Sequence, residues 1–300
     1  MKGGGNIAET NTILPQKTFT NGDWVSGQVT LEVSKDCQIN SLFIKFKGKA
    51  EVLWTERHGK TTVVYHSKDK YFSTFIFNRP TVNSFACNQF LMFLCFRDMP
   101  CSFTGSAGKI VYLLEAKLSR SMRIATRDST KINFMSNADP ASTPQHESKD
   151  KKLKIFTSGA VSMDVDIEKT GFFQGEGLKV LACIQNNSSR EIKPKYCVYK
   201  KHSFFARGKR RLHTIDLLKE VGEPIPPSAN TKVTRVITIP HDMEPSILNC
   251  NIIKVEYRLR VSSSVTRRLA TQVCVPVLLR DCAQKISCLP KKYFDAGKII

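Results

Sequence analysis

The feature that most constrains the fold of this chain is an alternation of apolar and polar side chains with a period of two residues. It is clearest in VSMDVDIE (161–168), where every second residue is apolar and the others are Ser, Asp or Glu. The segment IKVEYRLRV (253–261) repeats the pattern with Lys, Glu and Arg. Such a period places successive side chains on opposite faces of a β-strand. Both segments are therefore predicted to be half-buried strands of antiparallel sheets.

Weaker versions of the alternation recur along the chain, separated by Gly, Asn, Asp and Pro at turns. They occur at Val25–Val33, Leu42–Phe46, Ile110–Leu118, Leu178–Gln185 and Val233–Ile239. Sustained amphipathic helical spacing is hard to find. Many short strands joined by turns are typical of β-sandwiches, and 300 residues are enough for two domains. We predict an all-β fold of two sandwiches in tandem.

A stretch without large apolar side chains divides the chain. Residues 136–152 read SNADPASTPQHESKDKK and cannot contribute to a hydrophobic core. We predict an N-terminal domain over 1–135, an exposed connector over 136–154 and a C-terminal domain over 155–300.

The two predicted domains share a turn-rich entry into an alternating strand. The first reads NGDWVSGQV at 21–29 and the second TGFFQGEGL at 170–178. Two related sandwiches would produce this similarity.

The N-terminus and the apolar segments predict a protein of the cytosol. No apolar core of about 7–15 residues follows Lys2, as a secretory signal peptide requires. The longest uncharged apolar-rich run, FACNQFLMFLCF (85–96), is too short for a helix that spans a bilayer, which needs about 20 residues. It is predicted to be a buried strand or a short helix.

No motif of an enzyme, a metal site or a cofactor site survives a test of its spacing. Residues 105–110 (GSAGKI) have two residues between their glycines where a phosphate-binding loop has four, and no Ser or Thr follows Lys109. The ten cysteines never lie three apart, which excludes a CxxC pair, and the six histidines lack ligand spacing. A lone His is more often a surface or satisfied core residue than a catalyst. We expect no enzyme activity, no metal and no cofactor.

Positive charge is in excess and lies mostly in the second half of the chain. The sequence has 46 Lys and Arg against 26 Asp and Glu, a formal charge of +20, and residues 151–300 hold 27 of the basic and 13 of the acidic side chains. This balance favours an anionic partner such as nucleic acid, acidic lipid, or an acidic or phosphorylated peptide.

The densest basic cluster lies at 190–211, where nine Lys and Arg face one acidic residue, Glu191. One interpretation is the solvated outer face of a sheet, with Tyr196, Val198 and Phe204 alternating inward. The other is a site for phosphate or carboxylate groups, in which Gly208 lets backbone N–H groups approach the anion. Both interpretations stay open, and a nuclear localisation signal ranks behind them. The residues of this candidate site are Lys200, Lys201, Arg207, Lys209, Arg210 and Arg211.

Five segments, in order on both sides of the connector, carry a resemblance to the arrestin-domain-containing proteins, the α-arrestins. They are DWVSGQVTLEV (23–33), INSLFIKFKGKAEVLWTE (39–56), GSAGKIVYLLEAKL (105–118), the long segment 156–211 and EPSILNCNIIKVEYRLRV (244–261). The resemblance implies two immunoglobulin-like β-sandwiches, an arrestin N domain and an arrestin C domain, in a non-enzymatic adaptor. It also implies binding of integral-membrane cargo, with its ubiquitination and endosomal sorting.

The sequence departs from the family in three places. Residues 75–98 do not look like the family's next strands, and 262–300 lose the pattern of its final strand pair, which indicates alternative exon use or a faulty gene model. The third departure concerns PPxY motifs, whose prolines and Tyr bind a WW domain. The sequence PPSA (226–229) has Ala in place of Tyr, and LPKKY (289–293) has Lys in place of the second Pro. Direct recruitment of a HECT-type ubiquitin ligase is therefore not expected.

We expect a cytoplasmic adaptor, peripheral at the plasma membrane and endosomes. Its basic cluster would bind cytoplasmic segments of integral-membrane proteins, and an acidic membrane surface is a further partner. One alternative is a basic nucleic-acid-binding β module, but the chain has no zinc finger, RNP-like strand or basic helix, so nucleic acid is not the expected partner. The other alternative is a truncated adaptor that binds cargo without recruiting a ubiquitin ligase.

Overall fold

The fold consists of β-strands throughout the part of the chain that the structure describes. The structure, a computed structural model, describes residues 8–14, 17–33, 39–78, 86–95, 99–120, 124–136, 161–266 and 269–280. In these ranges it contains seventeen strands and no helix, and therefore no helix long and apolar enough to cross a membrane. The all-β class predicted from the alternation is confirmed.

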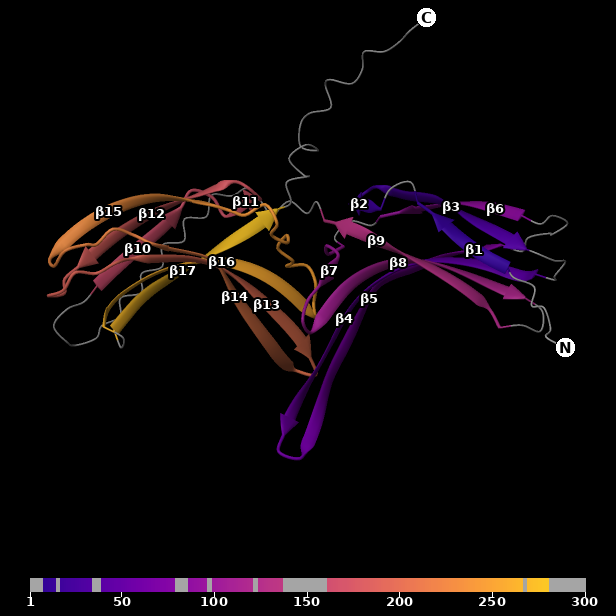
Figure 1. The fold of residues 1–300 in the computed structure, drawn as a ribbon, viewed down its shortest axis with the longest axis horizontal. Coiled ribbons are helices and arrows are strands. Elements are labelled where there is room, and N and C mark those ends of the chain that lie inside the picture. The colour runs from indigo at the N-terminus through magenta and orange to yellow at the C-terminus, as the bar shows by residue number, and fades with distance from the viewer. Residues whose placement is uncertain are drawn as a thin grey trace, which may run out of the picture. The chain divides into compact units, whose positions relative to one another are not determined.

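The chain divides into two compact units, each built from two sheets (Figure 1). The first unit comprises residues 1–138 with 204–211 and 249–253, and the second comprises the rest. Most of the predicted connector, residues 137–154, lies outside the described residues, so the domain boundaries stay predictions.

The first unit pairs a three-stranded sheet with a six-stranded one. The smaller sheet has the order β1 (Ala8–Ile13), β3 (Trp24–Val33) and β6 (Ala86–Leu94). The larger has the order β2 (Thr18–Thr20), β9 (Thr126–Met135), β8 (Gly108–Arg120), β4 (Ile39–His58) and β5 (Thr61–Asn78), and β7 (Phe103–Thr104) pairs with β8. All pairs are antiparallel except β2 with β9.

The core of the first unit follows from the alternation along its central strands. Every second residue of β8 from Ile110 to Leu118 is buried, as are Leu42, Ile44 and Phe46 of β4. The intervening positions carry Lys, Glu and other side chains that stay in contact with water. One face of the larger sheet is therefore apolar and packed, while its other face remains available to solvent.

Strands β4 and β5 continue beyond the sheet as a two-stranded ribbon (Figure 1). The pairing of β4 with β8 ends at Val52, whereas its pairing with β5 continues to His58. An isolated hairpin is only marginally stable in water. Here Trp54 stacks on Tyr65 with 5.1 Å between ring centroids, and this apolar contact supports the base of the ribbon.

The second unit repeats the plan. Its smaller sheet has the order β10 (Val161–Ile167), β12 (Gly177–Asn186) and β15 (Ala229–Thr238). Its larger sheet has the order β11 (Gly171–Phe173), β17 (Leu269–Arg280), β16 (Ile253–Thr266), β13 (Lys195–Ala206) and β14 (Lys209–Val221). The parts of these strands within 204–211 and 249–253 are grouped with the first unit. The apolar residues of 253–261 are at most 1% exposed, as their period of two predicts. The chain is thus two β-sandwiches in tandem.

The turn-rich entries of the two units have the same geometry. After β2, the Asp23 carboxylate accepts a hydrogen bond from the Thr20 N–H at 2.7 Å, and Gly22 has a φ of 84°. After β11, the Glu176 carboxylate accepts one from the Phe173 N–H at 2.8 Å. Gly175 has the corresponding φ of 77°. The similarity noted between residues 21–29 and 170–178 therefore reflects a repeated turn.

Two segments expected to depart from the pattern form strands. In 75–98, β5 runs to Asn78, and β6 pairs with β3 from Trp24 to Glu32, so the apolar run at 85–96 is mainly a strand. The prediction that the final strand pair is lost after residue 261 is wrong for the residues that the structure describes. There β16 continues to Thr266 and β17 pairs with it, because residues 273–279 again alternate between buried and half-buried positions. Residues 281–300 lie outside the described residues.

Candidate functional site

The densest basic cluster of the sequence lies on the hairpin of β13 and β14. A two-residue turn, Arg207-Gly208, joins the strands, with φ values of 49° and 70°. Positive φ at both central residues is typical of a type I′ turn, whose twist matches that of the strands it connects. Gly208 adopts this conformation without steric cost, and no atom lies within 4 Å of where its Cβ would be. The turn is thus tight and open to solvent.

Four of the predicted site residues surround this turn. Arg207, Lys209, Arg210 and Arg211 are all exposed. Because the last three lie on a strand, Lys209 and Arg211 point to one face of the hairpin and Arg210 to the other. The Arg210 guanidinium lies over the Phe205 ring, 5.8 Å from its centroid. The four charges therefore border the hairpin tip on both faces. We call these four residues the basic tip.

The other two predicted residues, Lys200 and Lys201, lie further along β13 and are engaged within the protein. The Lys200 Nζ is 2.9 Å from Glu244 Oε2, and the Lys200 side chain is 15% exposed. The Lys201 Nζ is 3.0 Å from Glu256 Oε2, with 17% exposure. Half-buried ion pairs of this kind satisfy the ammonium groups internally. The structure therefore separates these two lysines from the basic tip.

Glu244 is held by two basic side chains. His202, which is buried, places Nε2 3.6 Å from the carboxylate, and Lys200 contacts the same oxygen. The nearby His202 imidazole and the Lys200 ammonium group hold the pKa of Glu244 below its usual value, against the opposing effect of burial. His202 is thus a buried histidine of the sheet that lies beside a carboxylate.

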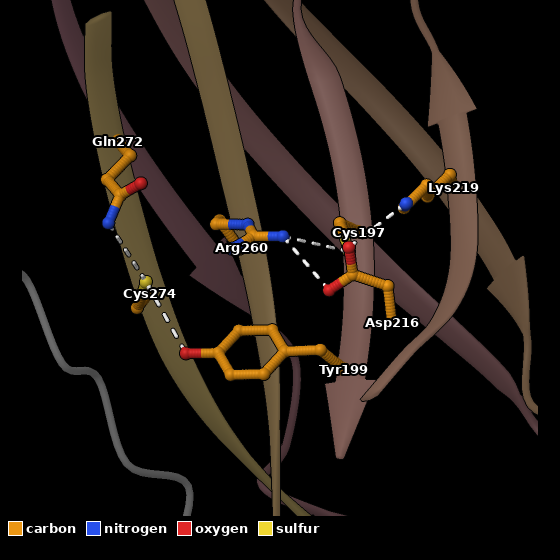
Figure 2. Close-up of polar contacts among 7 residues, drawn as sticks. All are labelled: Cys197, Tyr199, Asp216, Lys219, Arg260, Gln272 and Cys274. Atoms are coloured by element: carbon orange, nitrogen blue, oxygen red, sulfur yellow. Dashed lines mark hydrogen bonds and ion pairs between the residues drawn. The ribbon is translucent and has the colours of Figure 1, made fainter. Parts of the chain in front are cut away.

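The inward residues predicted for β13 are confirmed. Tyr196, Val198 and Phe204 are each at most 1% exposed. The outer face of the same sheet carries a polar row that sequence reasoning missed, shown in Figure 2. The Arg260 guanidinium of β16 donates to Asp216 of β14 at 3.1 Å. No local pattern points to such a pair, because its partners come from strands far apart in the sequence.

The polar row ties three neighbouring strands together. Arg260 also donates to the Cys197 Sγ of β13 at 3.4 Å and lies over the Tyr199 ring, 5.0 Å from its centroid (Figure 2). Asp216 is in turn 3.0 Å from Lys219 Nζ. Burial raises the pKa of the Cys197 thiol, and Arg260 opposes that shift. A thiol with a raised pKa is a poor nucleophile, so the arrangement supports structure and not covalent catalysis.

The described part of the chain also shows no group of side chains arranged as a metal site. Within the described ranges, no three His, Cys, Asp or Glu side chains are grouped so that they could hold a metal ion.

Segments in both halves of the chain match known protein families. Residues 10–86 match the family described as "Arrestin (or S-antigen), N-terminal domain", and residues 157–280 match "Arrestin (or S-antigen), C-terminal domain". The second match extends to the end of β17, so it includes residues that were expected to lose the pattern.

Similar curated proteins cover most of the chain. Arrestin domain-containing protein 4 of Mus musculus is 28% identical over 265 residues, which is 81% of this chain and 64% of that protein. Arrestin domain-containing protein 4 of Homo sapiens is 29% identical over 268 residues, covering 81% and 63%. Thioredoxin-interacting protein of Rattus norvegicus is 28% identical over 273 residues, covering 84% and 68%. The chain spans less than two thirds of the length of the two arrestin domain-containing proteins.

Proposed function

The chain belongs to the arrestin family as an α-arrestin-like member, and from this premise we propose that it is a non-enzymatic adaptor for integral-membrane proteins. It binds their cytoplasmic segments and serves their endocytic and endosomal sorting and ubiquitin-linked transport. In this role it is cytoplasmic and peripheral at the plasma membrane and endosomes. Residues 1–300 contain no PPxY motif, so a HECT-type ligase is not part of this proposal.

The observation that carries the proposal is the basic tip. Its four cationic side chains are exposed at the tip of a hairpin, whereas Lys200 and Lys201 of the same hairpin are held in ion pairs. Arg presents several N–H donors to carboxylate and phosphate groups, so three Arg and one Lys suit a segment that carries acidic or phosphorylated residues. Because the charges lie on both faces of the tip, they suit an extended segment that passes around it better than a small ion.

The test measures binding of an acidic, doubly phosphorylated peptide to the full chain. Changing Lys209, Arg210 and Arg211 to Glu should weaken binding at least tenfold, since each charge contributes about 1 kcal/mol or more to binding of an anionic group. Arg207 is left in place because its positive φ belongs to the turn. A matched variant changes Lys179, Lys193 and Lys232, exposed lysines of the second unit, to Glu.

Equal loss in both variants would mean that net charge alone drives binding, and the proposed site would be rejected. Unchanged binding in the tip variant would reject it as well. Filter binding to duplex and single-stranded DNA tests the alternative function. Affinity that persists at physiological salt would favour a nucleic-acid module over an adaptor.

A further inference from the structure

A second basic surface lies in the first unit, on the outer face of strands β4 and β5. Lys45, Lys47 and Lys49 alternate along β4, so their side chains share one face at intervals of about 6.8 Å. Lys68 and Lys70 alternate in the same way along β5. The two strands are antiparallel neighbours, which brings the two rows of lysines side by side.

A β-bulge places both rows on the same face. Gly48 pairs with Phe72, but the next residue, Lys49, pairs with Lys70, so Tyr71 is an extra residue on β5. A shift of one residue turns every following side chain to the opposite face. Without the bulge, the lysines of β5 would lie on the other face of the sheet from those of β4.

The five lysines form most of the lining of a hollow of about 310 Å³, and no acidic residue contributes to that lining. We call it the lysine hollow. Ser73 of β5 and Leu113 of β8 lie on either side of Lys47, and each has a shorter side chain than Lys. Long side chains around shorter ones give a concave surface.

Carboxylates neutralise only part of this charge. Glu115 pairs with Lys47, and Glu51 Oε2 lies 2.8 Å from Lys49 Nζ. In the described part of the chain, no ion pair involves Lys45, Lys68 or Lys70. Three ammonium groups that form no ion pair within the described ranges therefore border one small volume, and Glu115 acts on Lys45 only through space. Such a surface favours an anion with several charges, which contacts more than one ammonium group at once.

An exposed aromatic ring adjoins the hollow. Phe75 lies directly opposite Lys45 across the strands, and its ring stacks on Phe43 with 5.0 Å between centroids. Phe75 is nevertheless 58% exposed. Aromatic side chains beside basic ones are typical of surfaces that lie at a membrane interface, where the ring enters the boundary of headgroups and acyl chains.

We propose that the lysine hollow binds the phosphorylated inositol headgroup of a membrane lipid, with Phe75 inserted beside it. A headgroup with several phosphates is compact and multiply charged, as the hollow requires. A lipid with a single phosphate in its headgroup does not need a concave site. This inference concerns other residues than the basic tip and does not rest on the adaptor function.

The test compares vesicles with a soluble headgroup. Phosphatidylcholine vesicles contain either phosphatidylinositol 4,5-bisphosphate or phosphatidylserine at equal charge, and inositol 1,4,5-trisphosphate is the soluble probe. The wild type should prefer the phosphoinositide vesicles and bind the soluble probe. Changing Lys45, Lys68 and Lys70 to Gln should weaken both interactions by roughly tenfold to a hundredfold.

Three further variants separate the causes. Changing Lys179, Lys193 and Lys232 to Gln removes the same charge from exposed positions elsewhere and should leave binding of the soluble probe unchanged. The Lys209, Arg210 and Arg211 variant should also retain the probe, since the tip is a different site. Phe75→Ser should weaken vesicle binding several-fold without affecting the probe. Thermal unfolding of each variant verifies that it is folded.

Several results would overturn the proposal. Equal binding to phosphatidylserine vesicles would indicate attraction by net charge only. Loss of probe binding in the Lys179, Lys193 and Lys232 variant would lead to the same conclusion. If Phe75→Ser did not affect vesicle binding while the probe still required Lys45, Lys68 and Lys70, the ligand would be a free polyphosphate and not a lipid. If a phosphopeptide bound the hollow much more tightly than the probe and displaced it, while phosphoinositide vesicles did not displace it, the hollow would be a peptide site.

Discussion

The Ser188 hydroxyl donates a hydrogen bond to Asn186 Oδ1 at 2.6 Å, and both side chains are buried. On its other side, Asn186 Nδ2 faces three backbone carbonyl oxygens: Arg190 at 2.8 Å, Pro226 at 2.9 Å and Ile225 at 3.1 Å. A single amide thus joins the end of β12 to two separate loops.

Changing Asn186 to Asp should therefore destabilise the second unit strongly. The substituted carboxylate has nearly the shape of the amide, but it presents an oxygen to three carbonyl oxygens and removes the N–H donors that the amide supplies to them. We expect a loss of at least about 2 kcal/mol in the free energy of unfolding, measured by urea denaturation. Asn187→Asp is the control, because Asn187 is exposed and surface changes usually stay within about 0.5 kcal/mol. Similar effects of both substitutions would contradict this account.

The bulge of the lysine hollow requires glycine at position 48. A Cβ there would lie 2.6 Å from Cε1 of Phe72 and 2.6 Å from Cε1 of Tyr112, on the packed side of the sheet. Gly48→Ala should thus lower the free energy of unfolding by about 1–3 kcal/mol through overpacking. In Gly171→Ala the added Cβ would lie 3.7 Å from the Arg280 side chain, an ordinary contact, so little destabilisation is expected. Thermal and urea unfolding of both variants would reveal the difference, and a neutral Gly48→Ala would show that the rings move aside.

A buried tyrosine anchors a loop in each unit. Tyr112 donates its hydroxyl hydrogen to the Pro100 carbonyl oxygen at 2.7 Å, and Tyr257 donates to that of Glu244 at 2.7 Å. Replacing either by Phe should cost about 1 kcal/mol, because a carbonyl loses its donor. Tyr65→Phe is the matched control, since the described residues supply no hydrogen-bond partner for the Tyr65 hydroxyl. Calorimetry measures the stability of the three variants. An equal loss of stability in Tyr65→Phe would contradict the role of the two tyrosine hydrogen bonds.

The strands could be predicted because burial on one face leaves a direct trace in the sequence. The apolar residues of 163–167 and 253–261 alternate with charged ones, and the structure buries them as expected. The segment 262–280 was missed because the run VCVPVLL, at 273–279, has no charged residue to mark its outer face. Its alternation appears only in the structure, where Cys274 and Pro276 occupy the half-buried positions.

The candidate site was predictable only as a local density of charge. Gly208 beside Arg207 is compatible with a turn, but the sequence does not show which basic side chains the turn exposes. By contrast, the ion pairs of Lys200 with Glu244 and of Lys201 with Glu256 depend on pairing between distant segments, which one sequence does not reveal. These pairs decide which lysines remain available to a partner.

The lysine hollow had a partial signal in the sequence. Lys45, Lys47 and Lys49 alternate in KFKGK, which predicts one basic face of a strand. The contribution of Lys68 and Lys70 could not be predicted, because it depends on the register with β5 and on the extra residue at the bulge. A search for the highest charge per segment therefore finds 190–211 and overlooks this surface.

The ion pair beside the hollow predicts how stability depends on pH. A hydrogen bond from Lys49, with a further one from His66, lowers the pKa of Glu51 from 4.5 to about 2. A carboxylate whose pKa is lower in the folded state binds fewer protons there than in the unfolded state. Its contribution to stability is then present above about pH 4.5 and disappears as the pH falls toward 2.

Glu51→Gln should remove this part of the pH dependence. At neutral pH the variant should have a lower free energy of unfolding than the wild type, and the difference should shrink between about pH 4.5 and pH 2. Urea denaturation at a series of pH values measures both curves. Glu191→Gln, at an exposed position without an ion pair in the described ranges, should follow the wild type throughout. A difference between wild type and Glu51→Gln that stays constant down to pH 2 would show that Glu51 acts through packing and not through its charge.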